Sequence, residues 1–348
     1  MVTPMNRKPY AACLCSFVTL LLVGCAKSAS DAGDDSNDRP SIRYISNGVA
    51  SFWVIAEAGV DQGGQEFDAD VETLMPAEGI SDQKRMIEDS ITKGVDGLAV
   101  SPIDPENQIE LINKAASYTN LITHDSDAPG SNRLCYIGMD NYVAGRMCGE
   151  LVREAMPDGG KVAIFIGRLE QDNARRRRQG VIDAILQRSK DATRFDPPDA
   201  ELKEGKWHIV GTYTDQFDRA QGKANAEDAM SRHPDLGGAV GLFAYNPPLI
   251  LEALKQGEKL GEVKVIAFDE ADETLQGIID GTVHGTVVQN PFEYGRQSVR
   301  VLAGLARGQS LADLGVPSDG FLNIEARQIR KDNVEEFWAE LKKNLGEE

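Results

Sequence analysis

Residues 97–125, GLAVSPIDPENQIELINKAASYTNLITHD, contain one complete strand–helix–strand unit. Gly97 to Ser101 and Leu121 to Asp125 are short apolar runs, as expected of buried strands. Between them, Pro105 to Ala116 repeats apolar side chains every three or four residues, which predicts an amphipathic helix. The unit therefore indicates a parallel sheet that is covered by helices.

The same alternation extends in both directions from this unit, beginning at Ser41. About three hundred residues in ten such units exceed what one sheet usually organises, so two lobes are expected. The predicted fold class is α/β, with two doubly wound parallel-sheet lobes. The predicted strands are Ser41–Ser46, Ala69–Met75, Gly97–Ser101, Leu121–Asp125, Leu134–Gly138, Lys161–Gly167, Trp207–Thr212, Gly238–Ala244, Val263–Phe268 and Gly285–Val288. The predicted helices are Ser81–Lys93, Pro105–Ala116, Asn141–Met156, Arg175–Gln187, Arg219–Ser231, Pro247–Gln256, Ala271–Asp280 and Pro291–Arg307.

The amino terminus has the pattern of an export signal. Arg7 and Lys8 precede the apolar run Ala11 to Val23, which is too short for a permanent membrane span. The run ends in Leu22-Val23-Gly24-Cys25, which resembles the lipobox of bacterial lipoproteins. The resemblance implies cleavage before Cys25 and a lipid on its sulfur, so that residues 1–25 form a lipoprotein signal. Ordinary secretion, with Cys25 merely beside the cut, is the alternative.

Residues 26–40 are polar and small, and they are expected to form a flexible tether. The chain carries a formal charge of −18, and loss of Arg7 and Lys8 with the signal makes it −20. Such an acidic body repels phosphate backbones, so nucleic acid is a poor candidate partner.

Only Cys135 and Cys148 remain in the folded part once the amino-terminal cysteines are assigned to the signal and the lipid. Both lie among apolar residues, which favours buried thiols, although a disulfide in an oxidising compartment is an alternative.

Hydrogen-bonding side chains follow several predicted strands. Because the carboxyl ends of parallel strands line the ligand crevice of an open α/β sheet, we expect these side chains to meet. They are Asn47 with Phe52 and Trp53 shortly after, Asp125, Asn246, Asp269 and Gln289.

In order and spacing, six segments resemble the ribose/galactose-type periplasmic sugar-binding proteins of ABC importers, over Ile42 to Arg330. The segments are Ile122-Thr123-His124-Asp125, Ile137-Gly138-Met139-Asp140-Asn141, Asn173 to Gly180 with Arg177, Phe243-Ala244-Tyr245-Asn246, Ile266-Ala267-Phe268-Asp269 and Val287-Val288-Gln289-Asn290-Pro291.

The resemblance implies which residues contact a sugar. Phe52, Trp53 and Phe217 would pack on the ring faces, while Asn47, Asp125, Arg177, Asn246, Asp269 and Gln289 would bond the hydroxyls. The chemistry agrees, since a sugar has apolar C–H faces and a rim of hydroxyls that donate and accept. Arg177 would also balance the two carboxylates.

The resemblance further implies three crossovers between lobes, with hinge residues Asp140, Asn141 and Asn290. The N-terminal lobe would comprise residues 41–140 and 290–320, and the C-terminal lobe residues 141–289 and 321–330. Residues 331–348 form an extension in which 332–344 has the pattern of an amphipathic helix, expected to pack on a lobe.

Each proposed contact has a structural alternative. The three aromatic residues could belong to the core, and Asp269 or Asn246 could cap a helix. Of the run Arg175 to Arg178, one arginine is expected in the cleft and the others in solvent or in ion pairs. His124 is expected to be a buried strand histidine.

Ribose itself is a doubtful ligand. The ribose binders have an arginine after the Asp that corresponds to Asp125, where this chain has Ser126, and their aromatic pair is replaced by Val49 to Trp53. Another pentose, a hexose or a modified sugar remains open.

The sequence favours a monomeric binding protein without cofactor or metal, held by its lipid anchor in the periplasm or at the cell surface, that delivers a monosaccharide to an ABC permease. No phosphate-binding loop, nucleophile elbow or zinc motif indicates an enzyme. A ligand sensor that feeds a chemoreceptor or sensor kinase is the alternative. A cytoplasmic sugar-responsive transcription regulator is disfavoured by the export signal.

Overall fold

The computed structural model describes residues 39–346. The predicted export signal, Cys25 and most of the predicted tether lie outside the described residues. Within residues 39–346, no helix combines the length and the apolar character that a membrane span requires.

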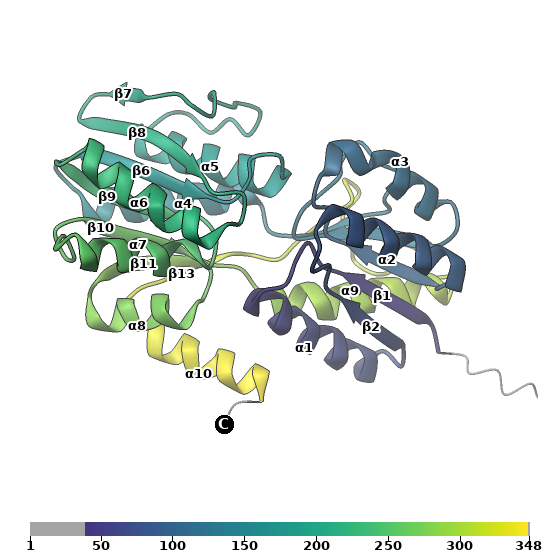
Figure 1. The fold of residues 1–348 in the computed structure, drawn as a ribbon. Helices are drawn as coiled ribbons and strands as arrows, with labels where there is room; N and C mark the ends of the chain where they lie inside the picture. Colours follow the sequence, from purple (N-terminus) through teal and green to yellow (C-terminus); the bar gives the residue numbers. More distant parts are fainter. Residues whose placement is uncertain (1–38, 347–348) are drawn as a thin grey trace, which may run out of the picture. The chain divides into compact units, whose positions relative to one another are not determined.

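The first sheet is parallel throughout, in the order β12-β5-β4-β3-β1-β2. Helices α1 and α9 bury one face of it and helices α2 and α3 bury the other (Figure 1). The strands are β1 (Ser41–Ile45), β2 (Asp70–Leu74), β3 (Gly97–Val100), β4 (Asn120–His124), β5 (Tyr136–Gly138) and β12 (Phe321–Asn323). The helices are α1 (Ser51–Glu66), α2 (Ile80–Lys93), α3 (Pro105–Ala116) and α9 (Pro291–Ala306).

The second sheet has the order β13-β11-β10-β9-β6-β8-β7, and only its two edge strands are antiparallel to their neighbours. Helices α4 and α5 cover one face, and α6, α7, α8 and α10 cover the other. The strands are β6 (Gly160–Ile166), β7 (Leu202–Glu204), β8 (Trp207–Thr214), β9 (Leu236–Gly241), β10 (Lys264–Phe268), β11 (Val283–Val288) and β13 (Arg327–Ile329). The helices are α4 (Asn141–Ala155), α5 (Asp172–Ile185), α6 (Arg219–Arg232), α7 (Asn246–Gln256), α8 (Asp272–Asp280) and α10 (Val334–Leu345).

The chain passes between the sheets three times, after β5, after β11 and between β12 and β13. Strands β1 to β5 and strands β6, β8, β9, β10 and β11 follow the same order, so the two lobes repeat one topology. In each, the winding direction reverses beside the first strand, and such a switch point opens a crevice at the carboxyl ends. The predicted fold class is confirmed.

Helix α1 was absent from the predicted elements. Its segment contains Gly59, Gly63 and Gly64, and glycine weakens a helix interior by roughly 1 kcal/mol each. Tertiary packing explains them, because a Cβ atom at Gly59 would lie 1.9 Å from the carbonyl oxygen of Phe292 at the start of α9. The close approach of α9 therefore requires a glycine there.

Strand β12 belongs to the first sheet through its pairing with β5. Residues 321–330 were expected in the second lobe, whereas the chain passes to the second sheet only after Asn323. Strands of three residues leave no recognisable period, which explains why β7, β12 and β13 were not predicted.

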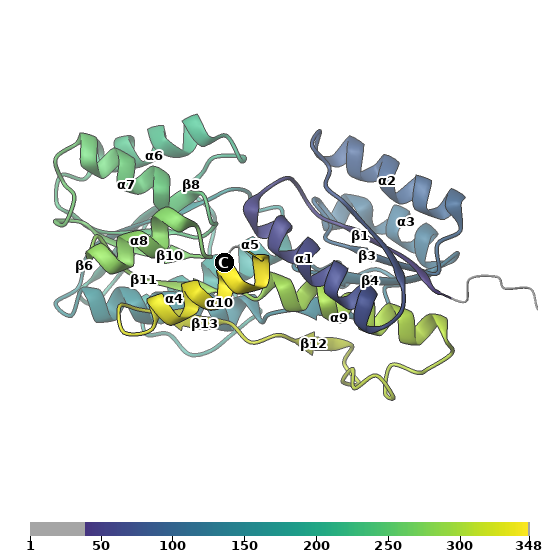
Figure 2. The same ribbon diagram turned by 90° about the horizontal axis from the view of Figure 1, so that it is seen from below.

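Helix α10 is the predicted carboxyl-terminal helix. Val334 and Phe337 are buried in the core of the second lobe, beside α8. The same helix contacts α1 of the first lobe (Figure 2). The helix therefore packs on a lobe as predicted, and it also touches the other one.

The two cysteines within residues 39–346 are free and buried, Cys135 in the first lobe and Cys148 in the second. The prediction of buried thiols is confirmed, and burial raises the pKa of the Cys135 thiol to about 12.

Candidate functional site

A cavity of about 930 Å³ lies at the carboxyl ends of both sheets. Its volume is within the range of small-molecule sites. Most of the predicted contact residues line it, namely Asn47, Phe52, Trp53, Asp125, Arg177, Phe217, Asp269 and Gln289. Residues from six segments that are distant in the chain therefore meet around one space.

Asp125 and Asp269 occupy equivalent places in the two lobes. Each directly follows the fourth strand in the repeated order, β4 or β10. Each also has a left-handed backbone, with φ of 55° at Asp125 and 66° at Asp269. Aspartate tolerates this conformation better than most residues, and such conformations gather at functional sites.

Three donors hold one oxygen of the Asp125 carboxylate. Asn47 Nδ2 and Asn173 Nδ2 each lie 3.3 Å from Oδ2, and Ser101 Oγ lies 3.1 Å from it. Burial raises the pKa of this carboxyl to about 7, against the opposing effect of Arg177. Every bond described above goes to Oδ2, so Oδ1 is available to accept from a ligand.

Asp269 is held in a similar way in the second lobe. Gln289 Nε2 donates to Oδ1 at 2.8 Å, and the backbone N–H of Ala244 donates to Oδ2 at 3.1 Å. The Tyr294 hydroxyl lies 3.2 Å from Gln289 Oε1 and fixes that amide in turn. Burial raises the pKa of Asp269, while Arg177 and these hydrogen bonds oppose the rise.

Arg177 is fully buried between the two carboxylates and the hinge. Its Nη1 donates to the Leu242 carbonyl at 2.7 Å, and its Nε and Nη2 lie 3.2 and 3.0 Å from Asn141 Oδ1. The guanidinium carbon lies 3.8 Å from the centroid of the Phe268 ring. This packing fixes the position of the positive charge that opposes the rise in the pKa of Asp125 and of Asp269.

The aromatic residues differ between the lobes. Phe52 and Trp53 start helix α1 and are 8% and 4% exposed, so they belong to the core and also border the cavity. Phe217, by contrast, is 40% exposed, and its ring centroid lies 5.7 Å from that of Phe243. Phe217 therefore has the more accessible face for a ligand.

Asn246 does not line the cavity. Its Nδ2 donates to Asp215 Oδ2 at 2.9 Å, and its Oδ1 accepts from the Phe243 N–H at 3.0 Å. Helix α7 already begins at Asn246, and no side-chain cap bond is formed there. The side chain holds the loop that carries Phe243 and Tyr245, so its predicted direct contact with a ligand has no geometric support.

The predicted hinge residues lie where the chain passes between the sheets. Asp140 caps α4 through Val143 N–H, and its own N–H donates to Asn323 Oδ1 at 3.1 Å, which joins two crossovers. Asn290 caps α9 through the Glu293 N–H at 3.1 Å. Asn141 is buried and binds Arg177, so it links the hinge to the cavity.

The other arginines of the run 175–178 have partners outside the cavity. Arg175 pairs with Glu106 at 3.1 Å and Arg176 with Asp172 at 2.7 Å. Arg178 is buried, and its Nε donates to Thr212 Oγ1 at 2.7 Å. The expectation of one cleft arginine among the four is met, with Arg178 buried rather than in solvent.

His124 is a buried strand histidine, as expected. Its ring stacks on Tyr44 with centroids 3.8 Å apart, and burial lowers its pKa to about 3. In the part of the chain that the structure describes, no three His, Cys, Asp or Glu side chains form a group able to hold a metal ion.

Several polar residues that line the cavity were not predicted, among them Arg168, Gln171 and Asn173. They follow β6, the strand beside the switch point of the second sheet, as Asn47 follows β1 in the first. The rule that strand ends line the crevice would have identified Arg168 directly after the predicted strand 161–167.

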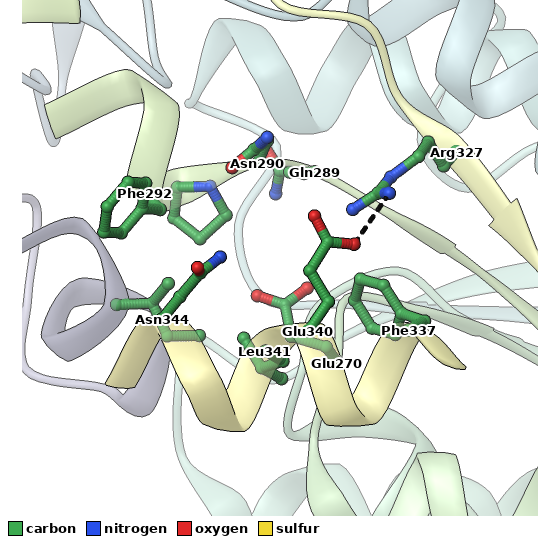
Figure 3. A pocket seen from close by; sticks show the side chains of 11 residues that line it. Glu270, Gln289, Asn290, Phe292, Arg327, Phe337, Glu340, Leu341 and Asn344 are labelled. Carbon is green, nitrogen blue, oxygen red and sulfur yellow. Dashed lines mark hydrogen bonds and ion pairs between the residues drawn. The ribbon is translucent and has the colours of Figure 1, made fainter. Parts of the chain in front are cut away.

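A second, much smaller cavity of about 20 Å³ lies between helix α10 and the start of α9 (Figure 3). The Glu270 carboxylate faces it, near the ion pair that joins Arg327 Nη1 and Glu340 Oε2 at 3.1 Å. Glu270 is 7% exposed, and neither carboxylate oxygen has a hydrogen-bond partner among residues 39–346. Burial and the neighbouring Asp269 raise its pKa, and Arg327 opposes them.

Comparison with known families identifies the chain. A family model described as a periplasmic binding protein domain matches residues 44–310. This chain belongs to the periplasmic binding protein family. The resemblance that the six segments indicated is thereby confirmed.

Individual relatives are distant but cover most of the chain. The ribose import binding protein of Haemophilus influenzae is 23% identical over 88% of this chain and 97% of its own. A glucose-galactose binding protein from Geobacillus stearothermophilus is 25% identical, with a TM-score of 0.74 over 85% of this chain and 98% of its own. A solute-binding protein from Burkholderia graminis, solved with D-arabinose, is 26% identical, with a TM-score of 0.75 over 84% and 96%.

Proposed function

We propose that this protein is an extracytoplasmic solute-binding lipoprotein that captures a monosaccharide between its two lobes and delivers it to an ABC importer. It acts in the periplasm or at the cell surface as a monomer, and it catalyses no reaction. A sensor role for the same fold remains the alternative, but no observation favours it.

The cavity between the sheets is the observation that carries the proposal. It combines an accessible ring, Phe217, with the carboxylates of Asp125 and Asp269, which point into one space from opposite lobes. A sugar needs this combination, because its ring faces are apolar and its hydroxyls require fixed donors and acceptors. The named sugars of the relatives, ribose, glucose, galactose and arabinose, support the same ligand class.

The mechanism is closure upon the ligand. A sugar that bonds Asp125 in one lobe completes its contacts only when Asp269 and Gln289 of the other lobe reach it. The ligand therefore stabilises the closed state by its extra contacts there.

The test is a panel of monosaccharides in a thermal-shift screen, followed by calorimetry with the best ligand. Asp269→Ala should weaken binding by at least about tenfold, because it leaves sugar hydroxyls and Gln289 without an acceptor in a buried site. The matched control is Asp272→Ala, an exposed residue three positions further on, which should bind like the wild type. Unchanged affinity in Asp269→Ala would remove this carboxylate from the site.

The lipid anchor rests on the Leu22 to Cys25 segment alone. Cells grown with a radioactive fatty acid should label the mature protein, and Cys25→Ser should abolish the label. An unlabelled wild-type protein would show ordinary secretion.

A further inference from the structure

Two hydrogen-bond donors in the second-lobe wall of the cavity have no acceptor in the described residues. Gln171 is 1% exposed and Arg168 is half-buried, and both line the cavity. Within the described residues, Gln171 Nε2 and Arg168 Nε are buried without a hydrogen-bond partner. A buried donor without an acceptor is unfavourable, so a ligand that supplies the acceptor recovers this cost.

The wall also carries positive charge without a partner. The Arg168 guanidinium carbon lies 5.1 Å from the centroid of the Phe217 ring, and that of Arg219 lies 6.0 Å from the Tyr245 ring. Neither guanidinium forms an ion pair within residues 39–346, whereas the nearby Arg175 and Arg176 do. The unpaired charges therefore gather beside the exposed aromatic ring.

The acidic side chains of the cavity do not neutralise these arginines. Asp125 and Asp269 are held by the donors described above, and the guanidinium that acts on both of them is that of Arg177. Glu78 and Glu273 also line the cavity, but both are exposed to solvent.

We propose that the ligand is a sugar acid, whose carboxylate is bound by Arg168 and Gln171 while its ring lies against Phe217. Arg219 adds a second positive charge at the same wall. A guanidinium matches a carboxylate with two parallel hydrogen bonds, which a neutral hydroxyl cannot reproduce. The inference rests on the proposed function, because it specifies the ligand class of the same cavity.

Calorimetry on the purified protein with two matched pairs tests the inference: galactose against galacturonate and glucose against glucuronate. At least one acid should bind about 10- to 100-fold tighter than its neutral partner, the effect of one charge-assisted contact. Arg168→Gln should remove that preference, so that the acid and its neutral partner bind within about threefold of each other. Arg168→Lys, which keeps the charge but lacks the planar fork, should retain part of it.

The control is Arg153→Gln, which removes the same charge from an exposed position on α4 and should change nothing. If neutral sugars bind and neither acid binds more tightly than its neutral partner, the inference is overturned and the proposed function still stands. An acid preference that survives in a folded Arg168→Gln would overturn the role of Arg168. Binding of glucose 6-phosphate without either acid would also overturn it, in favour of a phosphorylated ligand. Failure of every sugar, neutral or acidic, would remove the proposed function itself.

Discussion

Asp125 gives the cavity a titratable group near neutral pH. Its pKa is raised to about 7, first by burial and against the effect of Arg177. Sugar hydroxyls that donate to its free oxygen favour the ionised form, so ligand binding lowers this pKa. Binding should therefore release protons near pH 7 and tighten as the pH rises.

Affinity for the best-binding sugar should fall by about tenfold between pH 8 and pH 5.5, since one pKa unit corresponds to about 1.4 kcal/mol. Calorimetry at pH 7 in phosphate and in Tris, which differ in ionisation enthalpy, measures the protons released. The Asp125→Asn variant should release fewer protons when it binds the ligand. The control Asp61→Asn, at an exposed position, should release as many protons as the wild type. Proton uptake on binding would contradict this assignment.

Glu270 predicts a dependence of folding stability on pH. Its pKa in the folded protein is raised above the ordinary value of 4.5, so above that pH the folded state holds a proton that the unfolded state has lost. Stability therefore falls as the pH rises from about 4.5 toward the raised pKa. The charged groups around it are Asp269, Arg327 and Glu340.

Glu270→Gln cannot titrate, so its stability relative to the wild type should increase between pH 5 and pH 8. Urea unfolding at pH 5, 6.5 and 8 provides the free energies of unfolding. A constant difference between the two proteins across this range would show that Glu270 keeps its ordinary pKa.

Helix pairs in the two lobes depend on glycines at their crossings. In the second lobe, a Cβ atom at Gly180 would lie 2.1 Å from the Tyr142 carbonyl oxygen, and one at Gly145 would lie 2.0 Å from the Arg177 carbonyl oxygen. The close packing of α4 against α5 therefore fixes the position of Arg177 in the cavity.

Gly180→Ala should push the two helices apart and lower the free energy of unfolding by about 1–3 kcal/mol. It should also weaken ligand binding, because Arg177 moves with α5. Gly222→Ala is the matched control, since its Cβ would meet side-chain ends and no backbone, namely Leu249 Cδ1 at 3.0 Å and Asp215 Oδ2 at 3.1 Å. Urea unfolding measures the free energy of unfolding of both variants. If Gly180→Ala is as stable as the wild type, the helices do not need a glycine at this crossing.

Asn173 and Arg175 of the second lobe each contact a side chain of the first lobe. Asn173 Nδ2 of the second lobe lies 3.3 Å from Asp125 Oδ2 of the first, and Arg175 pairs with Glu106 at 3.1 Å. The first contact is buried, while the ion pair is exposed, with side-chain exposures of 37% and 71%. Their contributions to closure should therefore differ.

Asn173→Ala should weaken ligand binding by about tenfold, because it removes a buried, charge-assisted hydrogen bond that exists only when the lobes meet. Glu106→Gln should change it by less than about threefold, as for other exposed ion pairs. Calorimetry with the best-binding sugar compares the two variants. A larger effect from Glu106→Gln would mean that the exposed pair controls closure.

Sequence alone determined the fold class, most strands and helices, and most of the cavity residues, because strand and helix periods are local and parallel strands end at a common edge. It could not reveal helix α1, whose glycines disfavour a helix until α9 packs against them. It also could not assign the three-residue strand β12 to its sheet, which only pairing with β5 decides.

Tertiary structure alone decided which side chains have partners. Asn246 and Arg177 were both predicted to contact the ligand. Arg177 lines the cavity, whereas Asn246 binds Asp215 and Phe243 away from it. Arg168 and Gln171 lie in the loop after β6, and their lack of partners depends on everything folded around them. The reason is physical: burial and hydrogen bonding are properties of the neighbourhood that distant segments create, and no local pattern records them.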